Sequence, residues 1–174
     1  MKGSLDRCLI LGKSKTATYD VAGFVDSDYS GDLDHMHSIS RYIFTLCAGS
    51  ISQEASMQSI ATLSIIEAKY IVATEGVKEA VWLRGLISEL GISQGLTIVF
   101  WDSQSAIHLT KNDVYHSKTK HISIKHHYIR DTIATGEISV KKVHGLENPA
   151  DMLIKPLLIA KFQHCLDLVG IQSS

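Results

Sequence analysis

The pattern of apolar and polar residues along the chain predicts five short strands. Residues 21–26, Val-Ala-Gly-Phe-Val-Asp, form a buried-strand pattern that ends at a carboxylate. Segments 42–46 and 50–53 follow, and the short Cys-Ala-Gly spacer between them predicts an antiparallel meander. A fourth, strongly apolar segment, 96–102, also ends at an aspartate, and 137–143 alternates like a last strand.

Helical periodicity occupies the stretches between the later strands. Residues 64–90 carry apolar side chains at spacings of three and four, and Gly91 provides a stop signal. We expect a short helix at 105–109, a second helical segment at 122–132 and a final helix that begins near Pro149. This order predicts an α/β fold: a mixed five-stranded sheet, antiparallel in its first three strands, with helices on its faces.

Composition adds that the chain is an ordinary soluble domain. Its 174 residues suffice for one core, and 45% hydrophobic with 20% charged residues is typical of a globular protein. No apolar run reaches the about 18 to 20 residues of a membrane helix, and the start lacks a signal-peptide stretch, so we expect an intracellular protein without a membrane partner. The three cysteines are widely spaced without a CxxC pair, which favours small buried apolar residues over zinc ligands or disulfides.

Charge is unevenly distributed although the net charge is only −1. The window from 111 to 130 is basic, with a single acid, Asp113. Such a segment could bind nucleic-acid phosphates, or it could be a solvated helix face, and charge alone does not separate these readings. The candidate nucleic-acid-binding residues are Lys111, Lys118, Lys120, Lys125 and Arg130.

Three aspartates are candidate metal ligands. Asp26 and Asp102 each end an apolar strand, and Asp151 lies at the start of a late helix. Carboxylates at a sheet edge suit hard cations such as Mg²⁺, and two such ions can support phosphodiester cleavage. The alternative is that these residues are unrelated caps and turns. Asp28, two residues after Asp26, could orient a metal-bound water or could serve a turn.

Five sequence segments resemble motifs of one known family, and this resemblance favours the metal-ligand interpretation of the three aspartates. They retain order and spacing along the chain and resemble the motifs of ribonuclease H domains in copia-type retrotransposon Pol polyproteins. The segments are 23–32 (GFVDSDYSGD), 38–44 (SISRYIF), 101–107 (WDSQSAI), 116–122 (HSKTKHI) and 147–155 (ENPADMLIK).

The resemblance implies a fold, a substrate and a site. The fold would be ribonuclease H-like, and the activity would be hydrolysis of the RNA strand of an RNA–DNA hybrid with Mg²⁺ or Mn²⁺. The partners would be that hybrid and the reverse transcriptase portion of the same polyprotein. Residues 1–20 would be the tail of the reverse transcriptase connection, 21–160 the ribonuclease H-like domain and 161–174 a C-terminal extension. The catalytic and metal-binding positions would be Asp26, residue 69, Asp102 and Asp151.

Residue 69 departs from the family. The family segment STTEAEYMA has a catalytic glutamate where residues 64–72, Ser-Ile-Ile-Glu-Ala-Lys-Tyr-Ile-Val, place Lys69. Glu67 cannot replace it, because two residues along a helix correspond to a rotation of about 200°. Our hypothesis is that the Lys69 ammonium pairs with Asp26 and Asp102 in place of a metal ion, so that activity is weak or absent. A weaker version leaves one bound ion.

Further departures suggest a degenerate copy of an element. Residues 52–58 lack the tryptophan and the basic cluster of the family at this stretch. The alternative to an impaired nuclease is a catalytically inactive module that binds nucleic acid or packs against a reverse transcriptase. An unrelated metabolic enzyme has no support, because there is no Gly-rich phosphate loop or nucleophile elbow. His144 is interpreted as a surface-loop residue, although related enzymes carry a histidine for product release nearby.

Overall fold

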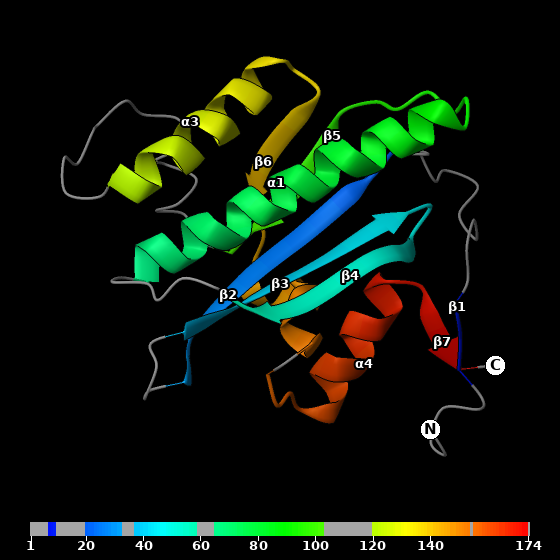
Figure 1. Ribbon diagram of the computed structural model, residues 1–174. Coiled ribbons are helices and arrows are strands. Elements are labelled where there is room, and N and C mark those ends of the chain that lie inside the picture. The colour runs from blue at the N-terminus through cyan, green and yellow to red at the C-terminus, as the bar shows by residue number, and fades with distance from the viewer. Residues whose placement is uncertain are drawn as a thin grey trace.

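A five-stranded sheet with strand order β4-β3-β2-β5-β6 forms the centre of the protein (Figure 1). The computed structural model describes residues 7–9, 20–32, 37–58, 65–102, 120–153 and 155–173. The first three strands of this sheet are antiparallel, and β5 and β6 run parallel to β2. The predicted mixed sheet is therefore confirmed. Its strands are β2 (Ala22–Asp32), β3 (His37–Leu46), β4 (Gly49–Met57), β5 (Thr97–Trp101) and β6 (Ile138–Lys142).

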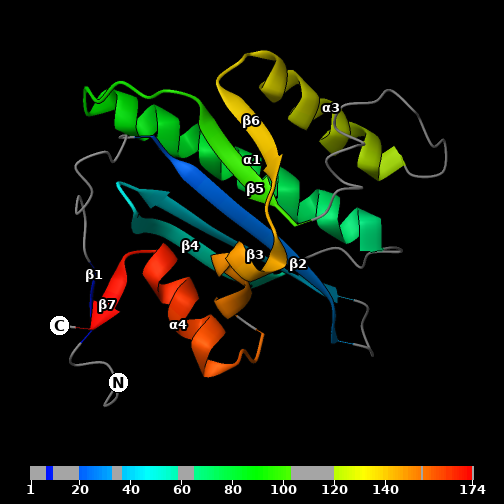
Figure 2. The ribbon, with the colours of Figure 1, turned by 180° about the vertical axis from the view of Figure 1, so that it is seen from behind.

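Helices cover both faces of the sheet, as the two opposite views show (Figures 1 and 2). Helix α1 (Ile65–Glu89) and helix α3 (Lys120–Ala134) pack on one face. The other face carries two short 3-10 helices, η1 (Gly145–Glu147) and η2 (Pro149–Leu153), and helix α4 (Ile159–Leu168). Because side chains alternate along a strand, successive residues of β2 face these two layers in turn.

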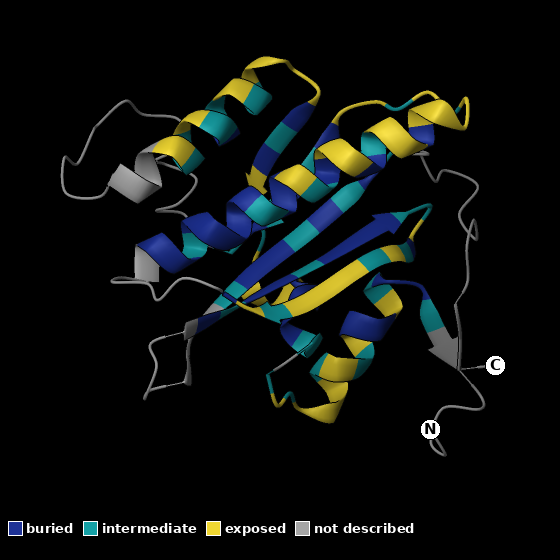
Figure 3. Cartoon of the chain, viewed as in Figure 1, coloured by how far each residue is buried: buried dark blue, intermediate teal, exposed yellow. Residues whose placement is uncertain are grey.

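Helix α1 lies close against β2 because glycine stands at the contact. A β-carbon at Gly76 would collide with the Val25 side chain, so the helix can approach the strand only without one. Val25, Val77 and Val99 are buried in the core between α1 and the sheet. Residues 67–77 of α1 are buried almost all round, whereas the second half of the helix exposes one side (Figure 3). Lys69 lies in this largely buried part of the helix, where its side chain is only partly exposed.

The two ends of the described chain meet in a small second sheet. Strand β1 (Arg7–Leu9) pairs antiparallel with β7 (Ile171–Ser173). The end of α4 is tied to the main sheet, because the Ser50 amide donates to the Val169 carbonyl at 3.0 Å. The boundaries that we placed at residues 20 and 160 stay a prediction. No helix in the described ranges is long and apolar enough to span a membrane.

One helix prediction is wrong in detail. The final helix does not run on from Pro149: a 3-10 helix ends at Leu153, and α4 begins only at Ile159. Pro156 lies in the gap, and proline both lacks an N–H donor and disfavours helical geometry in the residue before it. The helices predicted at 64–90 and 122–132 are confirmed as α1 and α3. The helix predicted at 105–109 lies outside the described residues.

Candidate active site

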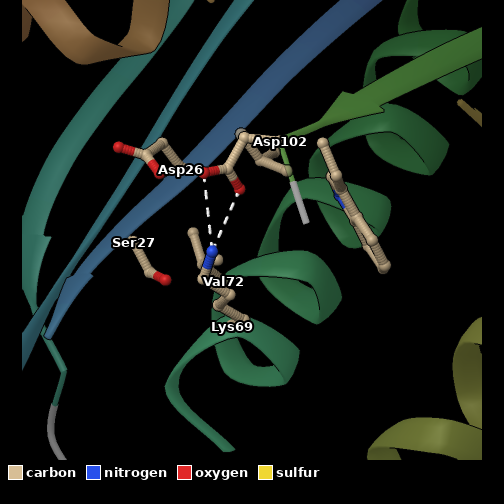
Figure 4. A pocket seen from close by; sticks show the side chains of 7 residues that line it. Asp26, Ser27, Lys69, Val72 and Asp102 are labelled. Atoms are coloured by element: carbon tan, nitrogen blue, oxygen red, sulfur yellow. Dashed lines mark hydrogen bonds and ion pairs between the residues drawn. The ribbon is translucent and has the colours of Figure 1, made fainter. Parts of the chain in front are cut away.

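The three candidate aspartates come from three different elements that lie beside the middle of β2 and the carboxyl end of β5. Asp102 directly follows β5, as predicted. The prediction that a strand ends at Asp26 is wrong, because β2 continues to Asp32 through its pairing with β3. Strands β2 and β5 are parallel neighbours with Val25 opposite Trp101, so Asp26 and Asp102 occupy adjacent register positions. Asp151 lies in η2 on the face opposite α1. A small pocket at this end of the sheet is lined by Val25, Asp26, Ser27, Lys69, Val72, Trp101 and Asp102 (Figure 4).

Lys69 is engaged with Asp102. Its Nζ lies 3.3 Å from Oδ1 and 3.4 Å from Oδ2 of Asp102, so one ammonium spans both carboxylate oxygens (Figure 4). The two side chains are partly exposed, at 24% and 34%. Lys69 was expected to pair with both Asp26 and Asp102, and this is confirmed for Asp102 alone. The cations that contact Asp26 are Arg41 and Lys155.

Asp26 is buried and contacts two cations. Arg41 lies directly opposite it in the β2–β3 register, and one guanidinium nitrogen of Arg41 is 2.8 Å from Asp26 Oδ2. The Lys155 ammonium is also 2.8 Å from this Oδ2. Both side chains of the Asp26–Arg41 pair are almost fully buried, at 2% and 0% exposure.

Asp151 completes a second group of charges on the η2 side. Lys155, one helical turn further on, donates to Asp151 Oδ1 at 2.6 Å, and Lys161 of α4 donates to Oδ2 at 2.6 Å. Buried Asn148 fixes the start of η2, because its side-chain amide donates to the Val25 carbonyl at 3.1 Å. Lys155 therefore links the carboxylates of Asp26 and Asp151.

The protein environment moves the pKa values of these two carboxyl groups in opposite directions. Burial raises the pKa of Asp26 above its ordinary value, and this outweighs the lowering by Lys155 and Arg41. Burial also acts to raise the pKa of Asp151, but hydrogen bonds from Lys155 and Lys161 lower it below the ordinary value. Burial acts to lower the pKa of Lys155, yet its hydrogen bonds to Asp151 and Asp26 raise it. Lys155 thus remains the ammonium between the two carboxyl groups.

The arrangement does not match a metal centre, although the ligand chemistry would suit Mg²⁺. Carboxylate oxygens are the ligands that this ion prefers. Within the described ranges, however, no three Asp, Glu, His or Cys side chains converge so that they could hold a metal ion. Asp26, Asp102 and Asp151 are each engaged by an ammonium or guanidinium group instead.

The basic segment is only partly described. Lys111 and Lys118 lie outside the described residues, and for Lys120 only the backbone is described. Burial lowers the pKa of Lys125, and Glu75 of α1 is close enough to act against this lowering. Arg130 is half-buried. Nucleic-acid binding by these five residues stays a prediction.

His144 and Asp28 were also considered as functional residues in the sequence. His144 is an exposed residue at the start of η1, and its Nδ1 accepts a hydrogen bond from the Leu146 amide at 3.3 Å. It lies in a surface loop, as expected. The side chain of Asp28 is outside the described residues, although its backbone pairs with Ile39 in the sheet.

Sequence reasoning missed three cations of the site. The spacing of four between Asp151 and Lys155 was an available signal, because such residues face each other along one helical turn. Nothing in the sequence pointed to Lys161, which belongs to a separate helix. Arg41 could be found only from the pairing of β2 with β3.

Comparison with known proteins identifies relatives over the whole chain. No family model matches it. The chain is 41% identical over 174 residues, all of its length, to the retrovirus-related Pol polyprotein from transposon TNT 1-94 of Nicotiana tabacum. It is 31% identical over 172 residues, 98% of its length, to the corresponding polyprotein from transposon RE2 of Arabidopsis thaliana. The chain spans only 13% and 12% of these two polyproteins.

Solved structures show the same fold at low sequence identity. LC11-RNase H1, isolated from compost, superposes with a TM-score of 0.59 at 15% identity, over 78% of this chain and 93% of that enzyme. Prototype foamy virus protease-reverse transcriptase superposes with a TM-score of 0.55 at 14% identity, over 94% of this chain and 22% of the viral chain. The chain is therefore a relative of one segment of the retrovirus-related Pol polyproteins of transposons, and it has the ribonuclease H fold.

Proposed function

We propose that this chain is the ribonuclease H domain of a copia-type retrotransposon Pol polyprotein, and that its nuclease activity is weak or absent. Its substrate class would be the RNA–DNA hybrid, and Mg²⁺ or Mn²⁺ would be the ion on which hydrolysis depends. The observation that carries the proposal is the contact of Lys69 Nζ with both carboxylate oxygens of Asp102.

Fold and motifs support the hybrid as substrate class. LC11-RNase H1 has also been solved in complex with an RNA/DNA hybrid, and that complex superposes on this chain with a TM-score of 0.58 at 14% identity. The five motif segments of the sequence stand in the order of copia-type ribonuclease H domains. Asp26 and Asp102 lie side by side at one end of the sheet, where the family places its acidic residues.

Electrostatics supports the loss of activity. Two like unit charges 4 Å apart repel by about 4 kcal/mol at an effective dielectric near 20, and a divalent ion doubles this figure. An ammonium at residue 69 therefore opposes metal binding where a glutamate would favour it. The same ammonium occupies both oxygens of Asp102, so this carboxylate is already neutralised within the chain.

Cleavage of a labelled RNA–DNA hybrid tests the proposal. The purified chain is incubated with hybrid in Mg²⁺ and, separately, in Mn²⁺, and Asp102→Asn serves as the control. We expect no cutting, or slow cutting that the control lacks. Rapid cutting by the natural chain, abolished in Asp102→Asn, would show that the site works without the helix glutamate and that Lys69 does not impair it.

A second candidate is a catalytically inactive module that binds nucleic acid or packs against a reverse transcriptase. It is favoured by the intact fold around a neutralised acidic centre, and by the viral protease-reverse transcriptase that contains this fold as part of a longer chain. The affinity for an RNA–DNA hybrid, measured by fluorescence anisotropy in EDTA, separates a module that binds nucleic acid from one that only packs against a reverse transcriptase. Salt-dependent binding without cleavage supports a nucleic-acid role, whereas absence of binding by the folded chain leaves only the structural one.

A further inference from the structure

Arg41 is the largest fully buried side chain in the described part of the protein, and it is charged. It lies on β3, which is paired on one side with β2 and on the other with β4. Its guanidinium reaches Asp26 Oδ2 at 2.8 Å across the β2–β3 ladder. A guanidinium without exposure cannot turn to water, so its charge depends on partners inside the protein.

This pair limits what Asp26 can do. A carboxylate oxygen has about two positions at which it can accept a donor or a cation. Asp26 Oδ2 is already contacted by Arg41 and by Lys155, each at 2.8 Å. The Lys155 side chain is 35% exposed and can move into solvent, whereas the Arg41 side chain is 0% exposed. Only the contact with Arg41 is therefore fixed by packing.

We propose that Arg41 is a second internal counter-ion of the acidic centre, independent of Lys69, which holds Asp26 as a structural partner and withholds it from divalent cations. The inference extends the proposed function, which attributes the impairment to Lys69 alone. It implies that the centre is neutralised from both sides of the sheet. Restoring a glutamate at residue 69 is then not sufficient to restore a metal site.

Titration of the protein with MgCl₂ by isothermal calorimetry tests this inference. The variants are Lys69→Glu, the same change combined with Arg41→Met, and a control that combines Lys69→Glu with Lys78→Met. Methionine fills the volume without the charge, and Lys78 is an exposed residue of α1 whose loss removes an equal charge elsewhere.

We expect no Mg²⁺ binding by the natural chain and weak binding by Lys69→Glu. Adding Arg41→Met is expected to raise the affinity at least tenfold, and adding Lys78→Met is expected to change it less than twofold. If Lys69→Glu alone binds Mg²⁺ as tightly as the variant that also lacks Arg41, the inference is overturned while the proposed function stands. Ordinary Mg²⁺ affinity in the natural chain would instead overturn the proposed function.

The variant that lacks Arg41 could fail to fold, so a second test uses thermal unfolding of variants in which Arg41 is retained. Asp26→Ala removes the carboxyl group that the buried Arg41 guanidinium contacts, and Asp102→Ala is the matched control in the half-exposed pair. We expect the midpoint to fall by about 6 to 15 °C for Asp26→Ala and by less than about 3 °C for Asp102→Ala. Equal, small changes would show that Asp26 is not a structural partner of Arg41 and would overturn the inference.

Discussion

The acidic centre has two halves that use the same ion-pair chemistry in different surroundings. The outer pair, Lys69 with Asp102, has contacts of 3.3 and 3.4 Å and side chains that are 24% and 34% exposed. The inner cluster has contacts of 2.6 to 2.8 Å and carboxylates that are almost fully buried. Its members are Asp26, Asp151, Arg41, Lys155 and Lys161.

The difference shows that the contribution of an ion pair to stability depends on how far its two side chains are buried. A solvent-exposed ion pair contributes about 0 to 1 kcal/mol, because water and salt screen it. Removal of one partner from a buried pair costs about 3 to 5 kcal/mol, because the other charge is left without compensation. The outer pair should therefore control metal binding with little effect on folding, whereas the inner cluster should be part of the fold itself.

Among the substitutions that remove no charge, the largest effect is expected at the anchor of the inner cluster. Asn148 is 1% exposed, donates to the Val25 carbonyl at 3.1 Å and accepts from the Ala150 amide at 3.2 Å. Asn148→Ala should lower the free energy of unfolding by about 2 to 4 kcal/mol in urea titrations, because buried polar groups lose their partners. His144→Ala, in the exposed loop nearby, serves as the control. A loss below 1 kcal/mol would show that η2 is not held through Asn148.

The position of the outer pair depends on the close contact of α1 with β2, which a substitution in α1 can disrupt. Gly76→Ala forces the helix away from Val25 and should cost about 1 to 3 kcal/mol. Gly85→Ala is the matched control on the same helix, because nothing lies near its new methyl group, and it should stabilise by up to about 1 kcal/mol. Urea unfolding of both variants measures the contrast, and the same sign for both would contradict the close contact of α1 with β2.

Acid should weaken the Asp151 part of the inner cluster. Hydrogen bonds from Lys155 and Lys161 lower the pKa of Asp151 in the folded state. The Asp151 carboxylate therefore stabilises the fold at any pH above the ordinary Asp pKa. This stabilisation is lost as the pH falls through the lower, folded-state pKa. Asp26 has the opposite effect: its pKa is raised in the folded state, so the folded protein binds the Asp26 proton more tightly than the unfolded chain, and acid favours the fold at this residue. Asp151→Asn should therefore be destabilising at pH 7 and less so near pH 3. A pH-independent difference between the two chains would exclude this linkage.

The smallest effect on folding is expected at the outer pair. Lys69→Met should change the free energy of unfolding by less than about 1 kcal/mol, and 1 M NaCl should reduce even this difference, because both partners are partly exposed. Urea titrations with and without salt measure it. A loss of several kcal/mol would show that the two halves of the centre are energetically alike.

Local patterns were sufficient for most of the fold. Short apolar runs and period-two alternation located the strands, and spacings of three and four located α1, because these patterns follow directly from backbone geometry. The final helix was misplaced because Pro156 separates η2 from α4, and the pattern beyond Pro149 did not show where helical geometry changes. Asp102 and Asp151 were found because one follows a strand and the other opens a helical segment. Asp26 was found from the apolar run before it, although β2 continues beyond it to Asp32.

The sequence by itself determined the order of the elements, the candidate aspartates at residues 26 and 102, and the lysine at residue 69 of α1. Only the tertiary structure decided how these charges are paired. Arg41 faces Asp26 because β2 and β3 pair in one register, and Lys161 reaches Asp151 because α4 folds back onto η2. Such contacts join residues far apart in the chain. They depend on strand register and on the packing of layers, which no local periodicity specifies.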